Sequence, residues 1–61
     1  MSKDLEEMID DLTNKYGVID IDYNISRDQP WRVEVDNCRE CIFKFGLTLR
    51  FAVSELHKKV M

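Results

Sequence analysis

The residues best suited to chemistry are Cys38 and Cys41, which form a C-x-x-C motif around Arg39 and Glu40. A closed zinc site needs four ligands, and His57 is the only histidine available to join the two thiolates. A second subunit or a carboxylate would have to complete that site. A redox pair would normally open a helix, whose dipole lowers the thiol pKa, but this motif falls on a turn between predicted strands. We therefore expect a turn cysteine and a core-facing Cys41, without metal or other cofactor; zinc binding by Cys38, Cys41 and His57 and redox switching are the alternatives.

A second candidate is the carboxylate pair Asp20 and Asp22, two residues apart in a predicted strand. Side chains at this spacing point the same way and lie about 7 Å apart. With Glu34 on the next strand they could hold Mg²⁺ or Ca²⁺. Arg32 and Lys44 are expected on the same face, however, and cross-strand charge pairing accounts for the acids without a metal. A solvated charged face is the preferred interpretation.

The sequence offers little else for catalysis. Ser54 and His57 are three residues apart on a predicted helix, but no oxyanion-stabilising loop or orienting acid accompanies them. The chain has no phosphate-binding loop, no dinucleotide fingerprint and no H-E-x-x-H zinc motif. We therefore expect a protein that is not an enzyme.

Composition and charge bound the possible partners. The chain has 61 residues and a net charge of −3. Residues 1–28 carry eight acids against three bases, and residues 29–61 carry four acids against six bases. The difference in charge between the two halves is mild, and the chain has no block of basic residues of the kind that nucleic-acid binding requires. The first turn is acidic and the chain has no long apolar run, so we expect neither a signal peptide nor a membrane span. A cytoplasmic protein is therefore predicted.

The elements that would position these residues follow from periodicity. A helical stripe predicts a helix over 2–16, with Ser2 as a candidate N-cap and Gly17 ending it. Alternation with a period of two then predicts strands over 18–26, 31–35 and 41–45. In these strands we expect the buried side chains to be Ile19, Ile21, Tyr23, Ile25, Trp31, Val33, Val35, Cys41, Phe43 and Phe45.

A second stripe predicts a helix over 48–60, capped by Thr48. Short connections between the strands imply an antiparallel meander. The predicted fold is a single α+β domain with two layers in the order αβββα: a three-stranded antiparallel meander with two helices packed on one face.

Three apolar residues do not fit this pattern. Phe51 lies off the stripe of the second helix, Leu47 precedes its cap, and Ile42 alternates onto the wet face of the sheet. One exposed apolar residue is ordinary, but three in one hairpin–helix unit predict an interaction surface. The alternative is that a tilt of the helix buries Phe51 in the core.

The segment from Trp31 to Val60 contains a strand, a turn, a second strand and then a T-L-x-x-A sequence that opens a helix. It resembles the strand–T-L-x-x-A–helix unit of very small phage and prophage accessory proteins, including short inhibitors of host enzymes and some antitoxin-like folds. The resemblance covers about half of the chain. It implies a protein that acts by stoichiometric binding, and it assigns no functional residue.

The leading hypothesis is therefore a non-catalytic binding protein, a phage-encoded inhibitor or anti-defence factor that works as a homodimer or higher oligomer. Its partners would be a second copy of itself and a host or viral protein. One alternative is an oligomer that sequesters a nucleotide through stacking and phosphate contacts from Trp31, Arg32, Arg39 and Arg50. Another alternative is an antitoxin-like regulator.

Overall fold

The fold is taken from a computed structural model that describes residues 3–37 and 39–61. The first helix, α1 (Leu5–Tyr16), begins at Asp4, whose carboxylate accepts a hydrogen bond from the Glu7 amide at 3.0 Å. The predicted helix started earlier, at Ser2, which lies outside the described residues. Gly17 ends α1 with a φ of 88°, and its amide donates to the Thr13 carbonyl at 2.7 Å.

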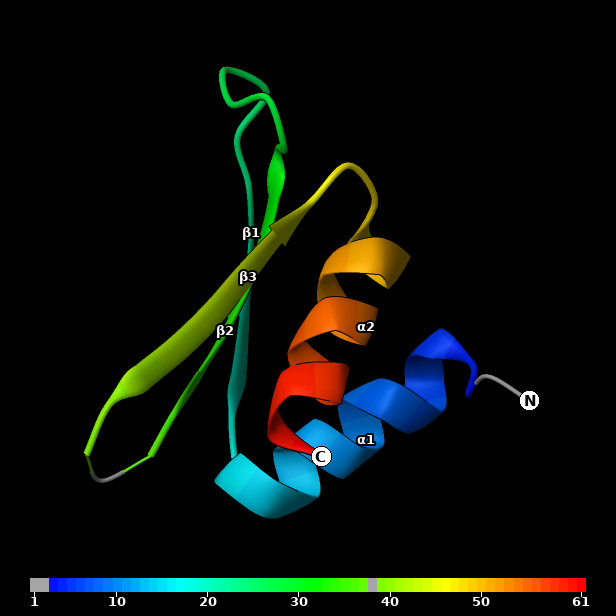
Figure 1. The fold of residues 1–61 in the computed structure, drawn as a ribbon, viewed down its shortest axis with the longest axis vertical. Helices are drawn as coiled ribbons and strands as arrows, with labels where there is room; N and C mark the ends of the chain where they lie inside the picture. The colour runs from blue at the N-terminus through cyan, green and yellow to red at the C-terminus, as the bar shows by residue number, and fades with distance from the viewer. Residues whose placement is uncertain (1–2, 38) are drawn as a thin grey trace.

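Three strands follow and form one antiparallel sheet in the order β1-β2-β3 (Figure 1). They are β1 (Ile19–Tyr23), β2 (Trp31–Asp36) and β3 (Cys41–Gly46). The first strand is shorter than the predicted 18–26, because Asn24 starts a turn. Its side chain accepts a hydrogen bond from the Ser26 amide at 2.9 Å, and its carbonyl accepts one from the Arg27 amide at 3.1 Å.

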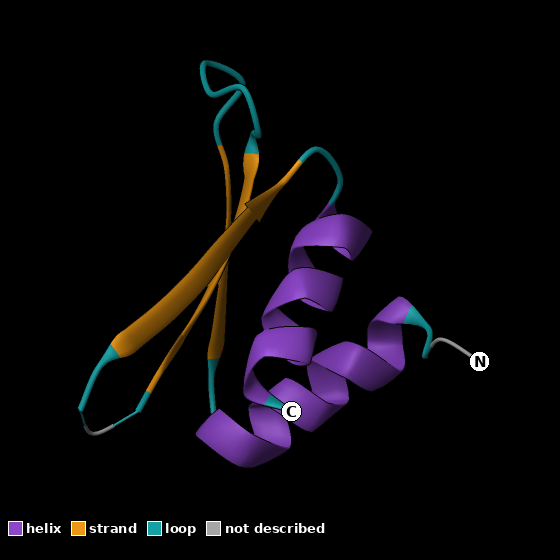
Figure 2. Cartoon of the chain, in the orientation of Figure 1, coloured by secondary structure: helices purple, strands orange, loops and turns teal. Residues whose placement is uncertain are grey.

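The second helix, α2 (Leu49–Val60), begins where the Thr48 hydroxyl accepts a hydrogen bond from the Phe51 amide at 3.1 Å. Both helices lie on the same side of the sheet, so the domain has two layers (Figures 1 and 2). The αβββα architecture with a three-stranded meander is thus confirmed.

The core fills the space between the helices and the middle of the sheet. Val33 and Val35 of β2 are fully buried beneath helix residues. Among the described residues, the buried hydrophobic side chains are those of Met8, Leu12, Val33, Val35, Ala52, Val53 and Leu56. Gly46 lets α2 approach the end of β3, because a Cβ at this position would lie 2.7 Å from the Ala52 nitrogen.

The strand register corrects the expectation for β3. Val33 pairs with Lys44 and Val35 pairs with Ile42, so Lys44 and Ile42 share the helix side of the sheet with the two valines. Cys41, Phe43 and Phe45 therefore point to the opposite side, and the prediction that they face the core was wrong. The cause is the turn after β2, which sets Asp36 opposite Cys41.

Asn37 organises that turn. Its side-chain oxygen accepts hydrogen bonds from the amides of Arg39 at 2.7 Å and Glu40 at 2.9 Å. Its own amide donates to the Glu40 carbonyl at 3.0 Å. These bonds join Asn37 to Arg39 and Glu40 across the turn and agree with the register that sets Asp36 opposite Cys41.

Candidate interaction surface

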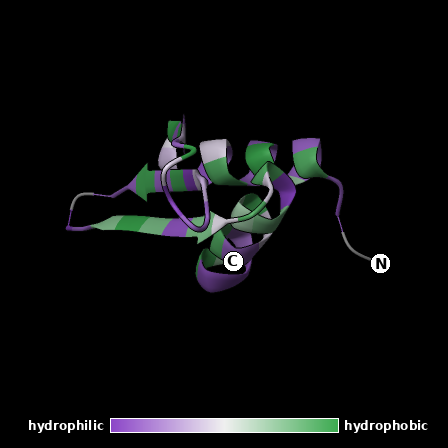
Figure 3. Ribbon diagram, turned by 90° about the horizontal axis from the view of Figure 1, so that it is seen from above, coloured by the Kyte–Doolittle hydropathy of each residue, from purple (hydrophilic) through white to green (hydrophobic). Residues whose placement is uncertain are grey.

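The helices leave one face of the sheet open, and this face carries two aromatic rings from β3. Phe43 and Phe45 meet edge to face with their ring centroids 5.6 Å apart. The Arg32 guanidinium lies 5.3 Å from the Phe43 ring, and the Arg27 guanidinium lies 5.3 Å from the Phe45 ring. Hydrophobic and hydrophilic residues alternate along the strands, as Figure 3 shows, because the two faces differ in their surroundings. Sequence reasoning missed these two aromatic residues.

The open face also holds the acids that were candidates for a metal site. Asp22 forms an ion pair with Arg27 at 3.1 Å, and Glu34 forms one with Arg32 at 2.8 Å. Asp22 and Glu34 are thus paired with arginines, but through the turn after β1 and within β2 rather than across strands as expected. Lys44, which was expected here, lies on the helix side instead.

Cys41 lies at the acidic end of this face. Its sulfur and carboxylate oxygens of Glu34 and Asp36 all lie within 4.8 Å of one another. Hydrogen bonding to Asp36, and then to Glu34, raises the pKa of the Cys41 thiol to about 11. A protonated thiol is a poor nucleophile and a poor metal ligand at neutral pH.

The zinc set named from the sequence is not assembled on this face. Cys38 lies outside the described residues. His57 belongs to α2 and lies on the helix side, where its Nε2 is 2.8 Å from an Asp11 carboxylate oxygen. Cys41 lies on the opposite side of the sheet, so His57 and Cys41 do not form one site within the described part of the chain.

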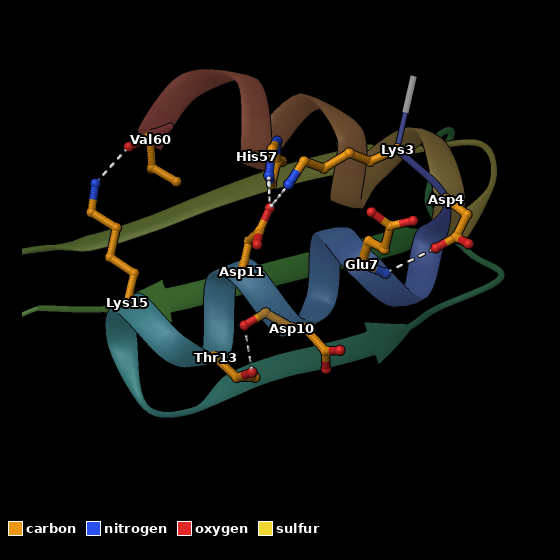
Figure 4. A network of polar contacts seen from close by, with 9 residues as sticks. All are labelled: Lys3, Asp4, Glu7, Asp10, Asp11, Thr13, Lys15, His57 and Val60. Atoms are coloured by element: carbon orange, nitrogen blue, oxygen red, sulfur yellow. Dashed lines mark hydrogen bonds and ion pairs between the residues drawn. The ribbon is translucent and has the colours of Figure 1, made fainter. Parts of the chain in front are cut away.

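Asp11 joins three parts of the helical layer (Figure 4). The same carboxylate oxygen accepts a hydrogen bond from Lys3 at 2.6 Å, in addition to its contact with His57. The hydrogen bond from Lys3, followed by the one involving His57, lowers the pKa of the Asp11 carboxyl. At the other end of α1, Lys15 donates to the Val60 carbonyl at 2.7 Å. These contacts hold α1 against α2 and give His57 a structural role.

The four residues considered for nucleotide binding are dispersed. Trp31 points to the helix side and meets Tyr23 edge to face at 4.8 Å, whereas Arg32 points to the open face. Arg39 belongs to the turn after β2, and Arg50 belongs to the first turn of α2. Trp31 and Arg32 therefore cannot act on one ligand from the same face.

Two of the three residues predicted to form an interface do come together. Leu47 and Phe51 are exposed, at 68% and 51%, and line one hollow of about 280 Å³ with Gln29 and Thr48. Ile42 does not belong to this surface, because it is half-buried and packs against the core. Phe51 likewise does not turn into the core, as the alternative interpretation had it. We refer to Leu47, Phe51, Gln29 and Thr48 as the apolar hollow.

No family model, curated protein or solved structure matches the chain. Among the described residues, neither helix is long and apolar enough to cross a membrane.

Proposed function

We propose that the protein is a non-catalytic binding protein that accommodates an apolar side chain of a partner protein in the apolar hollow. The observation that carries this proposal is the exposure of Leu47 and Phe51 around one depression. Exposed apolar residues that cluster on a small domain mark interaction sites. Binding energy at such sites is concentrated in a few aromatic anchors, and Phe51 is of that kind.

The hollow is held in place by the backbone around it. Phe51 lies in the first turn of α2, where its amide is bound by the Thr48 hydroxyl. Gly46 brings the start of α2 against the end of β3, so the loop that carries Leu47 is short and tightly held. A preformed site loses little conformational entropy when the partner binds, which favours affinity.

Among the described residues, the states of Cys41 and His57 favour stoichiometric binding over catalysis. The Cys41 thiol has a pKa of about 11, the opposite of an activated nucleophile. His57 contacts Asp11 between the helices and helps to hold them together. Neither residue lines the apolar hollow.

The class of partner follows from the resemblance of the segment from Trp31 to Val60 to phage accessory proteins. On that basis we propose a phage-type inhibitor or anti-defence protein that acts in the cytoplasm on a host or viral protein. Burial of the Phe51 ring by an apolar residue of the partner would supply about 2 kcal/mol.

Photo-crosslinking tests this proposal. A photoreactive phenylalanine would replace either Leu47 or Val18, which are equally exposed at 68%, in cells that produce the protein naturally. We expect position 47 to capture one discrete protein that co-purifies stoichiometrically with the wild-type chain. Position 18 serves as the matched control and should not capture it.

The captured protein then provides a quantitative assay. Phe51→Ala should weaken its binding by roughly 30-fold, which corresponds to about 2 kcal/mol, while the circular dichroism spectrum stays unchanged. The proposal is wrong if positions 47 and 18 capture the same proteins. It is equally wrong if Phe51→Ala binds the captured protein with wild-type affinity.

A further inference from the structure

The outer edge of β3 presents unpaired backbone groups. Among the described residues β3 is the last strand of the β1-β2-β3 sheet, so only one of its edges is bonded. In Figure 1 the sheet is seen nearly edge-on, and no segment crosses in front of β3. A shallow hollow runs along this edge and is lined by Glu40, Cys41, Ile42, Phe43, Lys44 and Lys59. Such an edge is a template for pairing with another strand.

Hydrogen bonds in the turns identify the free groups. The Asn37 amide donates to the Glu40 carbonyl, so Asn37 and Glu40 are a hydrogen-bonded pair of the hairpin. Such pairs alternate with non-bonded pairs along an antiparallel ladder, so residues 40, 42 and 44 direct their backbone groups to β2. Cys41, Phe43 and Phe45 therefore direct theirs outward. On β1, the Asn24 amide donates to the Pro30 carbonyl, so residues 20 and 22 bond to β2. The backbone groups of residues 19, 21 and 23 therefore point away from the sheet.

We propose that a second copy of this chain pairs with β3 through this edge, antiparallel about a two-fold axis at Phe43, to build one six-stranded sheet. The outward groups then match, because Phe43 lies opposite the partner's Phe43 and Cys41 lies opposite the partner's Phe45. On the helix side, Ile42 lies opposite the partner's Lys44. No two like charges of β3 lie directly opposite one another in this register.

The charge pattern selects β3 over β1 for this contact. The equivalent pairing of two β1 strands about Ile21 would set Asp20 opposite the partner's Asp22 on both sides of the axis. Like charges directly opposite one another destabilise a strand pair. Lys44 restricts the β3 register in the same way, because pairing centred on Lys44 would bring two lysines together.

Pairing of β1 with β3 of another copy is also disfavoured. It would place Asp20 beside the phenylalanine rings on the open face, which would remove water from a carboxylate that has no ion pair among the described residues. It would also leave a free edge at each end and grow without limit. The two-fold pairing of β3 closes, and it joins the aromatic pairs of both copies into one continuous surface.

Sedimentation velocity over a concentration series tests the proposal with a matched pair of variants. Phe43→Lys sets two lysines opposite one another across the axis, whereas Ile21→Lys makes the same kind of change on β1. The two residues are similarly exposed, at 47% and 44%. We expect a wild-type dimer whose dissociation constant rises at least about tenfold in Phe43→Lys and stays unchanged in Ile21→Lys.

Amide hydrogen exchange on the wild-type protein gives a second readout that needs no variant. In the dimer the amides of Cys41, Phe43 and Phe45 should be protected, while those of Ile19, Ile21 and Tyr23 exchange rapidly. A monomer at all concentrations, equal exchange at the two edges, or a dimer broken only by Ile21→Lys would overturn the proposal. Phe51→Ala should leave the dimer intact, so failure of this proposal and failure of partner binding at the apolar hollow are distinguishable.

Discussion

Gly46→Ala should destabilise the protein even though the change adds one methyl group. The new Cβ would lie 2.7 Å from the Ala52 nitrogen and 3.0 Å from the Ala52 Cα. Both are backbone atoms of α2, so a change of rotamer cannot relieve the contact. The start of the helix must move away from β3, and the loop that carries the apolar hollow must move with it.

The magnitude follows from two opposing terms. Forcing a methyl group into filled space costs about 1–3 kcal/mol. Replacing glycine by alanine at a permitted φ returns about 0.4–1 kcal/mol by restricting the unfolded chain. The net loss of about 1–2 kcal/mol is a large part of the roughly 3–5 kcal/mol that a core of this size supplies. It corresponds to a fall in Tm of several degrees or more, at roughly 4–8 °C per kcal/mol.

Urea unfolding followed by far-ultraviolet circular dichroism measures this loss, which should appear as a lower midpoint with an unchanged slope. Gly17 provides the contrasting control, because nothing lies within 4 Å of a Cβ there and its φ is 88°. At Gly17 the cost comes from backbone conformation alone, so Gly17→Ala should destabilise the protein without any steric contact. A Gly46→Ala variant as stable as the wild type would refute the close approach of α2 to β3.

Two further predictions concern titratable groups. The folded-state pKa of Asp11 lies below its unfolded value of 3.8, so its ionised form stabilises the protein above that value, and the contribution is lost as the pH falls through the folded-state pKa. Asp11→Asn should therefore lower stability at neutral pH and flatten the pH dependence of urea unfolding in acid. Asp10→Asn is the control, because it makes the same charge change without these contacts. Identical acid profiles for the two variants would contradict the contacts of Asp11 with Lys3 and His57. The Cys41 thiol, with a pKa of about 11, should be alkylated at pH 8 more slowly than a cysteine in an unstructured peptide, measured by mass spectrometry in a Cys38→Ser background. Asp36→Asn should accelerate that reaction because it removes the largest cause of the raised pKa, and an unchanged rate would exclude the hydrogen bond.

The fold could be predicted because local signals in the sequence agree with one another. The apolar period changes from 3.6 to 2 immediately after Gly17, and that glycine does end α1 with a positive φ. Thr48 was predicted to cap the second helix, and its hydroxyl does bind the Phe51 amide. Leu47 and Phe51 could be found because they do not fit the helical stripe, and both are exposed.

The orientation of β3 could not be predicted from alternation alone. Cys41, Ile42 and Phe43 are consecutive apolar residues, so the segment fits a buried face in either of two frames. The larger aromatic side chains favoured the frame that proved wrong. The deciding information lies outside the strand, in the hydrogen bonds of the turn around Asn37.

The turn around Asn37 links the free edge of β3 to the aromatic side chains of the open face, because one choice of register fixes both. Pairing Val35 with Ile42 sends Ile42 and Lys44 under α2, which leaves Phe43 and Phe45 on the open face. The same alternation turns the backbone groups of Cys41, Phe43 and Phe45 outward, so the strand edge that is free to pair also carries the aromatic side chains. A one-residue slip of the register would bury the phenylalanines and expose Lys44. The backbone groups that point to the free edge would then be those of Ile42 and Lys44, and the lysine disfavours pairing with a second copy. The acidic β1 edge, which has no such alternative frame, remains the edge that resists association.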